Sequence, residues 1–349
     1  MSRAAMLGSQ AAIEDLARKG AERGVDLRPG LTRVEQRLRE LVATDLPLLD
    51  QSSRHLVDAG GKRFRPMLVL LTGALGGGGA DDALVDAGAI VELVHLSTLY
   101  HDDVIDAASM RRGMPAAHVR WSNTVAILTG DFLLARASER SAALGPEVTR
   151  IMARTIADLC RGQIREILGT SGARGHGADP VEPDREHYLK VIGEKTAALI
   201  AASCRLGALL SGQPSKAVET LTDYGWHLGV GFQLADDVLD IAGQPAESGK
   251  VTGTDLREGV RTLPVLLALE ADGPRGPLRR LLTEPTDVNV DAALALLRDH
   301  PAMDLARDAA RLEAAKAKRA LRDLDTASVD GPVLEGLAYL ADHAADRVA

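Results

Sequence analysis

Long stretches of the chain place apolar residues three and four positions apart, which is the spacing of helices that bury one face or more. Alternating runs of β-branched residues between tight turns, which indicate strands, are scarce. Glycine and proline clusters separate the apolar segments. The pattern predicts an all-α protein with helices over 31–58, 64–76, 81–107, 119–142, 146–169, 184–210, 215–243, 255–271, 288–298, 301–326 and 330–347.

Composition agrees with a folded globular chain. Of the 349 residues, 46% are hydrophobic and 26% are charged, which is typical of soluble globular domains. A chain of this length buries a sizeable core without disulfide bonds. We therefore expect one all-α domain over residues 31–349, preceded by a variable N-terminal segment, residues 1–30.

The charge balance excludes one broad class of function. Lys and Arg number 41 against 49 Asp and Glu, so the formal net charge is −8. Surfaces that bind nucleic acid are basic, and we therefore expect no nucleic-acid partner. No segment approaches the roughly 20 uncharged apolar residues of a membrane span, and the N-terminus lacks the apolar core of a signal peptide. These features predict a cytoplasmic protein without a transmembrane segment.

The two cysteines, Cys160 and Cys204, are too few for a disulfide framework or a four-cysteine zinc site. Both lie in apolar helical contexts, so we expect buried, unreactive thiols.

The pattern D-D-x-x-D occurs twice, at residues 102–106 and again 134 residues later at residues 236–240. In each copy the first and last Asp lie one turn apart on the same helix face. Such neighbouring carboxylates repel each other unless a cation compensates them, and Mg²⁺ binds through one or two carboxylates together with substrate phosphates. One copy alone is equally compatible with a solvated helix end, whereas two copies favour a metal site. The six carboxylates belong to Asp102, Asp103, Asp106, Asp236, Asp237 and Asp240.

Positive groups suited to an anion lie near these motifs. Lys62 and Arg65 belong to the sequence GGKRFRP at a predicted helix start, where backbone N–H groups favour phosphate. Arg111 and Arg112 follow the first motif, and arginine offers phosphate a bidentate fork. Taken alone, each cluster is more often a solvated basic surface.

Lysine is rare in this chain, with 8 residues against 33 arginines, so each lysine invites a specific explanation. Lys195 lies in the sequence GEKT, and Lys250 follows the second motif by ten residues. His95 lies two turns before the first motif on the same helix face, although a histidine there is more often an ordinary core residue. Gln233 lies three residues before the second motif and points toward it. Two acidic clusters, several cations and apolar helices together fit a magnesium-bound diphosphate with a hydrocarbon tail, and metal-assisted ionisation of that diphosphate.

At these residues the chain resembles the trans-isoprenyl (polyprenyl) diphosphate synthase family. The matching segments follow the family's order across about 200 residues. They are GGKRFRP (60–66), ELVHLSTLYHDDVIDAASMRRG (92–113), GDFLLA (130–135), GQ (162–163), GEKT (193–196), GFQLADDVLD (231–240), GK (249–250) and TLP (262–264). The resemblance implies a single-domain orthogonal helical bundle of the isoprenoid synthase type around a central cavity, and a homodimer.

The resemblance also implies the reaction and the roles of the residues. Members condense isopentenyl diphosphate head-to-tail with an allylic diphosphate, using two or three Mg²⁺ ions per site. The implied metal ligands are Asp102, Asp106 and Asp236, with Asp103, Asp237 and Asp240 as further acids. The implied contacts of the allylic diphosphate are Arg111, Lys195, Thr196, Gln233 and Lys250. The implied contacts of isopentenyl diphosphate are Lys62, Arg65, His95 and Arg112.

One position departs from the family's pattern. The family often has a Lys two residues before the Thr of the TLP segment, where this chain has Val260. Arg261 is offset by one residue, which rotates it by about 100° on a helix. Both residues are therefore left out of the predicted site, and whether Arg261 replaces the lysine stays open.

Product length is predicted from the helix before the first motif, along which the product grows in this family. One turn rises about 5.4 Å and accommodates roughly one isoprene unit. Ser97 and Thr98 lie one turn before the motif and are small, whereas large aromatic residues there would stop growth early. We expect a medium- or long-chain product beyond four isoprene units.

Four other interpretations remain at this stage. A geranylgeranyl diphosphate synthase would give a shorter product with the same motifs. A class I terpene cyclase carries one D-D-x-x-D but normally a different second motif. A non-catalytic subunit of a heteromeric synthase typically loses the acidic motifs. A plain helical metal-binding or structural protein leaves the ordered basic motifs unexplained.

Overall fold

The computed structural model describes residues 26–77, 79–170, 173, 175, 177–243, 252–282, 286–324 and 329–346. Within these ranges the regular secondary structure is helical, apart from a two-stranded antiparallel hairpin of β1 (Met110–Arg111) and β2 (Met114–Pro115). The all-α prediction is confirmed. The longer elements are α2 (Arg28–Val42), α3 (Pro47–Asp58), α4 (Phe64–Ala74), α5 (Asp82–Ile105), α7 (Asn123–Ala143), α8 (Pro146–Leu168), α10 (Ala198–Leu210), α11 (Ser215–Ala242), α17 (Ala302–Arg322) and α18 (Gly331–Asp346).

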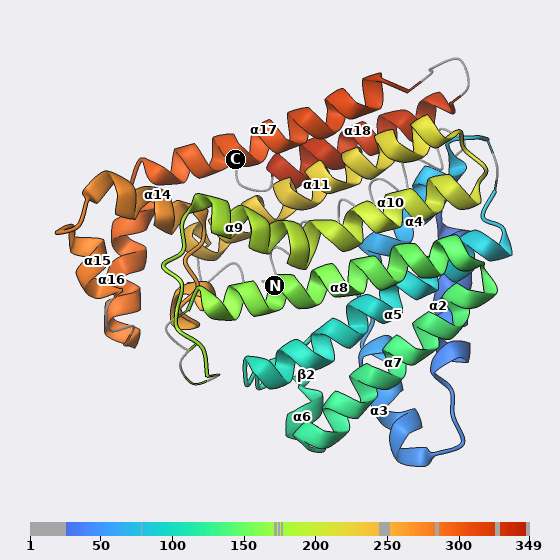
Figure 1. The fold of residues 1–349 in the computed structure, drawn as a ribbon, viewed down its shortest axis with the longest axis horizontal. Coiled ribbons are helices and arrows are strands. Elements are labelled where there is room, and N and C mark those ends of the chain that lie inside the picture. The colour runs from blue at the N-terminus through green and yellow to red at the C-terminus, as the bar shows by residue number, and fades with distance from the viewer. Residues whose placement is uncertain are drawn as a thin grey trace.

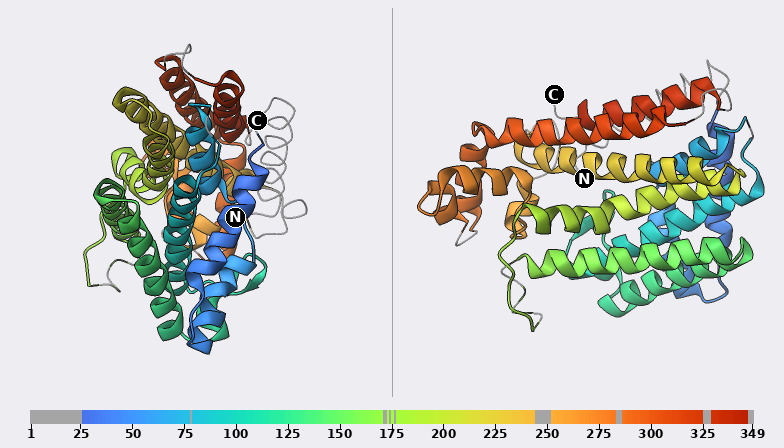
Figure 2. Two further views of the ribbon diagram at one scale, coloured as in Figure 1. Left: turned by 90° about the vertical axis from the view of Figure 1, so that its right-hand side faces the viewer. Right: turned by 45° about the horizontal axis from the view of Figure 1, so that its top comes forward.

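Shorter elements complete the chain between them. They are α6 (Ala117–Arg120), α9 (Arg185–Ile192), the π-helical turn η2 (Gly193–Ala197), α13 (Thr254–Arg257), α14 (Leu263–Asp272), α15 (Pro277–Leu281) and α16 (Asp287–Arg298). The long helices run side by side in layers, and α14, α15 and α16 gather at one end of the molecule (Figure 1). The same end holds the last turns of α8 and the start of α9, as the turned view in Figure 2 also shows.

Three predicted helices are interrupted where proline or a tight turn intervenes. The predicted helix 31–58 is two helices, because the chain is extended before Pro47, which opens α3. A proline lacks the N–H that a continuous helix needs and disfavours helical geometry in the residue before it. The segment 119–142 contains a break between α6 and α7, and 255–271 divides into α13 and α14. The helix α15 was not predicted.

The central helix α5 explains why the site has a fixed frame. Its residues from Leu84 to Leu96 are nearly all buried, and α2, α4, α7 and α10 pack around it. Of the helices described, α5 alone is long and apolar enough to cross a membrane, but 78% of its apolar stretch is buried inside the protein. Burial on all sides is the property of a core helix.

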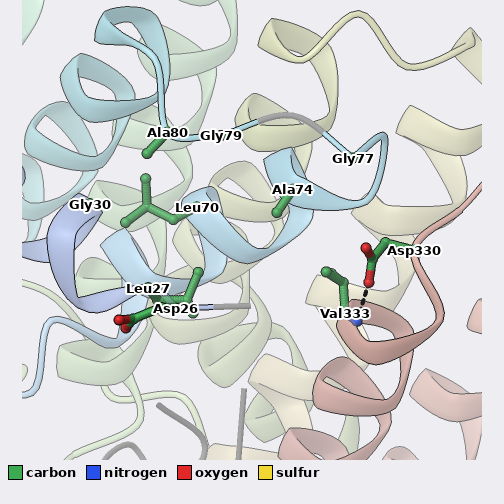
Figure 3. A pocket seen from close by; sticks show the side chains of 10 residues that line it. All are labelled: Asp26, Leu27, Gly30, Leu70, Ala74, Gly77, Gly79, Ala80, Asp330 and Val333. Carbon is green, nitrogen blue, oxygen red and sulfur yellow. Dashed lines mark hydrogen bonds between the residues drawn. The ribbon is translucent and has the colours of Figure 1, made fainter. Parts of the chain in front are cut away.

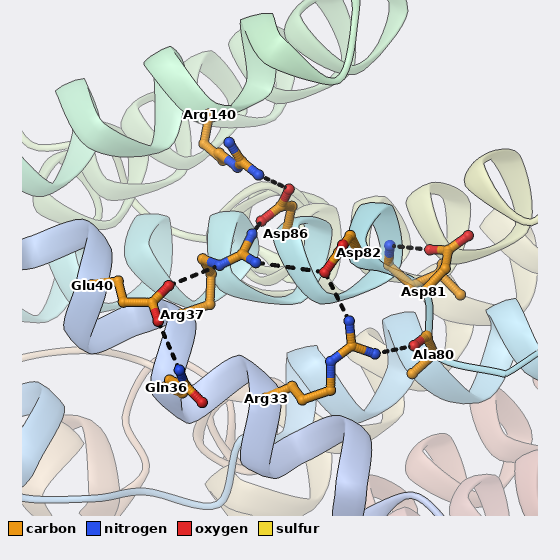
Figure 4. Close-up of polar contacts among 10 residues, drawn as sticks. Arg33, Gln36, Arg37, Glu40, Ala80, Asp81, Asp82, Asp86 and Arg140 are labelled. Atoms are coloured by element: carbon orange, nitrogen blue, oxygen red, sulfur yellow. Dashed lines mark hydrogen bonds and ion pairs between the residues drawn. The ribbon is translucent and has the colours of Figure 1, made fainter.

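A group of ion pairs joins the first turns of α5 to the neighbouring helices (Figure 4). The buried Asp86 pairs with Arg37 from α2 and with Arg140 from α7. Arg33 from α2 pairs with Asp82 at 2.8 Å. A buried carboxylate is stable only when it is paired. These ion pairs therefore hold α2, α5 and α7 together at the end of α5 opposite the first acidic motif.

A cavity of about 170 Å³ lies where α2, α4 and the start of α18 meet (Figure 3). Leu27, Leu70, Ala74 and Val333 supply apolar walls, and Asp330 lies at its edge, where its carboxylate accepts the backbone N–H of Val333. None of the predicted site residues is among its lining residues within the described chain.

One sequence prediction about the cysteines is wrong. Cys204 is fully buried, as expected, and burial raises the pKa of its thiol. Cys160 is exposed on α8. It belongs to an apolar stripe with Ala153, Ala157 and Ile164 that this chain leaves exposed, so the apolar pattern around Cys160 does not mark the interior.

Candidate active site

The first acidic motif lies at the C-terminal end of α5. Asp106 is the residue that ends the helix, and its N–H donates to the carbonyl of Asp102 at 2.8 Å. The C-terminal end of a helix carries partial negative charge, so carboxylates gathered there are destabilised unless cations oppose them. Burial, with further contributions from Asp106 and Glu166, raises the pKa of Asp102 to about 6, although Lys195 acts in the opposite direction.

The central aspartate of this motif has a different role from its neighbours. Asp103 is fully buried; its Oδ1 accepts the Nε–H of Arg111 at 2.6 Å and forms an ion pair with Nη2 of the same guanidinium at 2.6 Å. Arg111 belongs to β1, so this ion pair fixes the hairpin after α5 against the motif. The pair orients the guanidinium that was predicted to contact a diphosphate.

The second acidic motif lies in the last two turns of α11. Asp237 is buried, and its carboxylate accepts hydrogen bonds from the Tyr188 hydroxyl at 2.5 Å and the Gln233 amide at 2.8 Å. Burial raises the pKa of Asp237 to about 7 despite these two donors. The amide oxygen of Gln233 in turn accepts the hydroxyl of Thr196 at 2.9 Å, so Gln233 and Thr196 are brought together as predicted.

Asp240, the last aspartate of this motif, is hydrogen-bonded to backbone N–H groups. Its two carboxylate oxygens accept the N–H groups of Thr254 and Asp255, each at 3.2 Å. It therefore fastens the start of α13 to the end of α11. Lys250, the predicted diphosphate contact between these two elements, lies outside the described residues.

Lys195 and Glu166 lie beside the first acidic motif. Lys195 lies on the π-helical turn η2 and forms an ion pair with Glu166 of α8. Burial opposes its charge, but Glu166, Asp102 and Asp106 together raise the pKa of Lys195. The π-helical turn lies against Gly162, where a Cβ would approach the backbone nitrogen of Lys195 to 2.5 Å. A side chain at residue 162 would therefore displace the turn that presents the lysine.

Three acidic residues of this region were not predicted, namely Glu166, Asp255 and Glu258. Burial, with contributions from Asp106 and Glu166, raises the pKa of Glu258 to about 7, and Asp240 adds to the effect. Asp106 of the first motif and Asp240 of the second therefore both act on Glu258. It follows that α5, α8, α11 and the segment after α13 face one region. Glu166 could have been predicted from the sequence, because it follows the GQ segment by one helical turn. No sequence motif marks Glu258.

A second cluster is strongly cationic. Arg65 lies in the first turn of α4, and its Nε is buried without a hydrogen-bond partner. Burial and the nearby Arg112 lower the pKa of Arg65 to about 10, while burial, Arg65 and Arg112 hold the pKa of His95 well below its usual value. Arg112 donates to the carbonyl of Leu56 at 2.9 Å. Cations that oppose one another's charge in this way favour the binding of an anion.

Not every basic residue nearby belongs to that cluster. Arg63, at φ +46°, is buried in ion pairs with Glu35 at 2.5 Å and Glu92 at 2.7 Å. It braces the turn before α4, and its neighbour Lys62 immediately precedes it. Arg261 forms an ion pair with Glu182 at 2.5 Å and so points to the segment before α9.

The two predicted chain-length residues lie on α5 one turn before the first motif. Ser97 is fully buried, and its hydroxyl has no hydrogen-bond partner. The hydroxyl of Thr98 donates to the carbonyl of His95 at 2.8 Å, which turns its polar group back to the helix.

The acidic residues suit metal ions that share their ligands with a substrate. Among the described residues, no three Asp, Glu, His or Cys side chains come close enough to hold a metal ion by themselves. Mg²⁺ is typically bound by one or two carboxylates plus phosphates and waters. Paired aspartates with raised pKa values therefore fit a magnesium–diphosphate complex better than a self-contained metal cage.

Comparisons with known proteins identify relatives across nearly the whole chain. The sequence profile described as "Polyprenyl synthetase" matches residues 46–297. A nonaprenyl diphosphate synthase of Mycobacterium tuberculosis is 45% identical over 324 residues, which are 92% of this chain and 93% of that protein. The crystal structure of a decaprenyl diphosphate synthase from Rhodobacter capsulatus superposes with a TM-score of 0.83 at 33% identity, covering 97% of this chain and 99% of that one.

A further crystal structure carries ligands. It is a polyprenyl synthase from Caulobacter crescentus complexed with calcium and isoprenyl diphosphate. Its TM-score is 0.83 at 34% identity, and the match covers 97% of this chain and 98% of that one.

Proposed function

The chain belongs to the polyprenyl synthetase family, and from this we propose that it condenses isopentenyl diphosphate with an allylic diphosphate to give a medium- or long-chain trans-polyprenyl diphosphate. It is a prenyltransferase. Relatives that make nonaprenyl and decaprenyl diphosphates cover more than nine-tenths of the chain and support the long product. The observation that carries the proposal is that both acidic motifs act on one residue, Glu258, beside Lys195, with a separate buried cluster of arginines around His95.

The residues divide the work between two diphosphates. Arg111, Lys195, Thr196, Gln233 and Lys250 would bind the allylic diphosphate. Lys62, Arg65, His95 and Arg112 would bind the diphosphate of isopentenyl diphosphate. Asp102, Asp106 and Asp236 would hold Mg²⁺, two or three ions per site, which supplies positive charge to stabilise the departing diphosphate. Diphosphate departs from the allylic substrate and leaves an allylic cation, the isopentenyl double bond attacks that cation to form the new C–C bond, and loss of a proton restores a double bond and completes one cycle.

A direct assay tests the reaction. Purified protein with farnesyl diphosphate and labelled isopentenyl diphosphate should form products longer than geranylgeranyl diphosphate when Mg²⁺ is present. EDTA should abolish the reaction. Turnover that survives EDTA, or no turnover by the chain alone, would contradict the proposal, and a product that stops at geranylgeranyl diphosphate would support the shorter-chain alternative.

Chain length has its own test at Ser97. Its side chain is buried, and a larger residue there would fill the space one turn before the motif. Ser97→Phe should therefore shorten the product without abolishing turnover. Thr98→Phe is the comparison variant, because residue 98 lies on an adjacent side of the same helix. An unchanged product distribution in both variants would show that the product follows another path.

Homodimerisation is also proposed, and an uncovered apolar face supports it. Ile127 and Leu128 on α7 are 42% and 58% exposed, and Ile164 on α8 is 57% exposed. The two helices pack side by side (Figure 1). A second copy would cover this face, because exposed apolar stripes mark interaction sites. Light scattering should give the mass of a dimer, and Leu128→Asp with Ile164→Asp should give a monomer.

A further inference from the structure

Two buried polar atoms have no partner where the first acidic motif meets the hairpin that follows it. One is Oδ2 of Asp103, and the other is Nδ1 of His118. Asp103 already uses Oδ1 for Arg111. Buried polar atoms in native proteins nearly always have a hydrogen-bond partner, so two unpartnered atoms in one region require an explanation.

The two atoms are complementary and belong to neighbouring elements. His118 is the second residue of α6, and α6 packs against α5, which carries Asp103. The positive form of His118 lowers the pKa of Asp103, which indicates that the imidazole lies within electrostatic reach of the carboxylate. A carboxylate oxygen only accepts, whereas a neutral imidazole donates from one nitrogen.

The other imidazole of this region is already satisfied. His55 uses Nε2 with the carbonyl of Pro115 at 2.9 Å, and its Nδ1 accepts the Arg120 guanidinium at 3.2 Å. Its ring also meets Trp121 edge-on at 5.2 Å. Both nitrogens of His55 are thereby engaged, and His118 remains as the donor for Asp103.

We propose that His118 is a positioning residue for the first acidic motif, with its Nδ1–H connected to Oδ2 of Asp103 through one buried water. Buried waters typically join two to four polar groups that cannot reach one another directly. The connection holds the Asp103 carboxylate by Oδ2, the oxygen that Arg111 does not contact. It thereby fixes the direction of the guanidinium, and the consequence for substrate binding rests on the proposed function.

Three substitutions of His118 separate the hydrogen bond from simple packing. Asn places its amide nitrogen near the position of Nδ1, whereas Gln places its amide nearer the position of Nε2. We expect His118→Ala and His118→Gln to raise KM for the allylic diphosphate about tenfold, because such supporting contacts are typically worth 10–100-fold. His118→Asn should stay near the unsubstituted protein, and KM for isopentenyl diphosphate should change little in all three.

The control is His300→Ala. His300 is half-buried between α16 and α17, and its Nδ1 accepts the N–H of Ala302 at 3.0 Å. It should leave both KM values unchanged. Equal losses in the Asn and Gln variants, or equal effects on both substrates, would overturn the positioning role. Thermal melts of all four proteins identify any variant that fails to fold.

A readout without turnover tests the hydrogen bond itself. Nitrogen NMR of the ¹⁵N-histidine-labelled protein should show His118 as the Nδ1–H tautomer, assigned by loss of the signal in His118→Asn. Asp103→Ala should change that signal. An Nε2–H tautomer would overturn the inference whatever the activity. An Nδ1–H tautomer in a protein without prenyltransferase activity would support the hydrogen bond and refute the proposed function, so the two failures are distinguishable.

Discussion

The two D-D-x-x-D motifs end two long helices, but their central aspartates are stabilised by different chemistry. Asp103 is held by the charged guanidinium of Arg111, whereas Asp237 is held by the neutral donors Tyr188 and Gln233. Burial raises the pKa of both carboxylates; at Asp103 the full charge of Arg111 opposes the rise, whereas at Asp237 only neutral hydrogen-bond donors do. The central aspartate of the first motif is therefore held by an ion pair, and that of the second by a polar network in which its pKa is about 7.

Removing the central charge should affect the first motif more than the second. Asp103→Asn leaves Arg111 without its partner, and breaking a buried ion pair costs about 3–5 kcal/mol. Because the Arg111 side chain is 25% exposed, we expect the lower end, about 3 kcal/mol of unfolding free energy. Asp237→Asn keeps a polar acceptor between neutral donors and should cost less. Urea unfolding with EDTA present measures both, and equal losses would remove the distinction.

The position of Lys195 depends on the absence of a side chain at Gly162. In Gly162→Ala the new Cβ meets the backbone of Lys195 and Glu194 at 2.5 and 2.9 Å, and backbone atoms cannot rotate away. Overpacking costs about 1–3 kcal/mol, and we expect the upper part of that range together with a loss of turnover. Gly331→Ala is the control, since nothing lies within 4 Å of its Cβ. Normal activity in Gly162→Ala would show that the π-helical turn tolerates movement.

Sequence patterns predicted the helices and the ends of the helices that carry the motifs, because these depend on local spacing. The family resemblance, not the spacing, assigned Thr196 and Gln233 to one group and Arg65, His95 and Arg112 to another, and the structure places the members of each group near one another. Sequence patterns did not predict Tyr188 beneath Asp237 or Glu258 between the motifs, because these contacts join segments that are distant in the chain. Pro47 was visible, but apolar spacing on both sides suggested one helix. Burial was predicted for Cys160 because apolar spacing does not distinguish a core face from an exposed apolar stripe.

The pKa of Asp237 predicts a pH dependence that belongs to the second motif. A raised pKa means that the folded protein holds this proton more tightly than the unfolded chain, whose Asp pKa is about 4. The contribution of Asp237 to the stability of the metal-free protein should therefore be greatest below that value and fall as pH rises toward about 7. One proton gives a slope of at most about 1.4 kcal/mol per pH unit.

Two variants assign this slope. Asp237→Asn should reduce it, because the titrating group is gone. Tyr188→Phe should extend the fall to higher pH, because the Tyr188 hydroxyl lowers the pKa of Asp237. Unfolding free energies from pH 4 to 8 in EDTA provide the measurement. A slope that Asp237→Asn leaves unchanged would assign the titration to other acids of the site, such as Glu258.

The smallest effect is expected beyond the second motif, at Arg261. Its ion pair with Glu182 joins a side chain 26% exposed to one 69% exposed, and such surface pairs are worth about 0–1 kcal/mol. Arg261→Ala should therefore lower stability by less than about 1 kcal/mol, and salt should remove most of the difference. KM for the allylic diphosphate should not change, because the guanidinium is directed to Glu182. A several-fold rise in that KM would mean that Arg261 leaves Glu182 and binds the diphosphate of the allylic substrate. Arg261 would then be a further cationic residue of the site, close to the second motif.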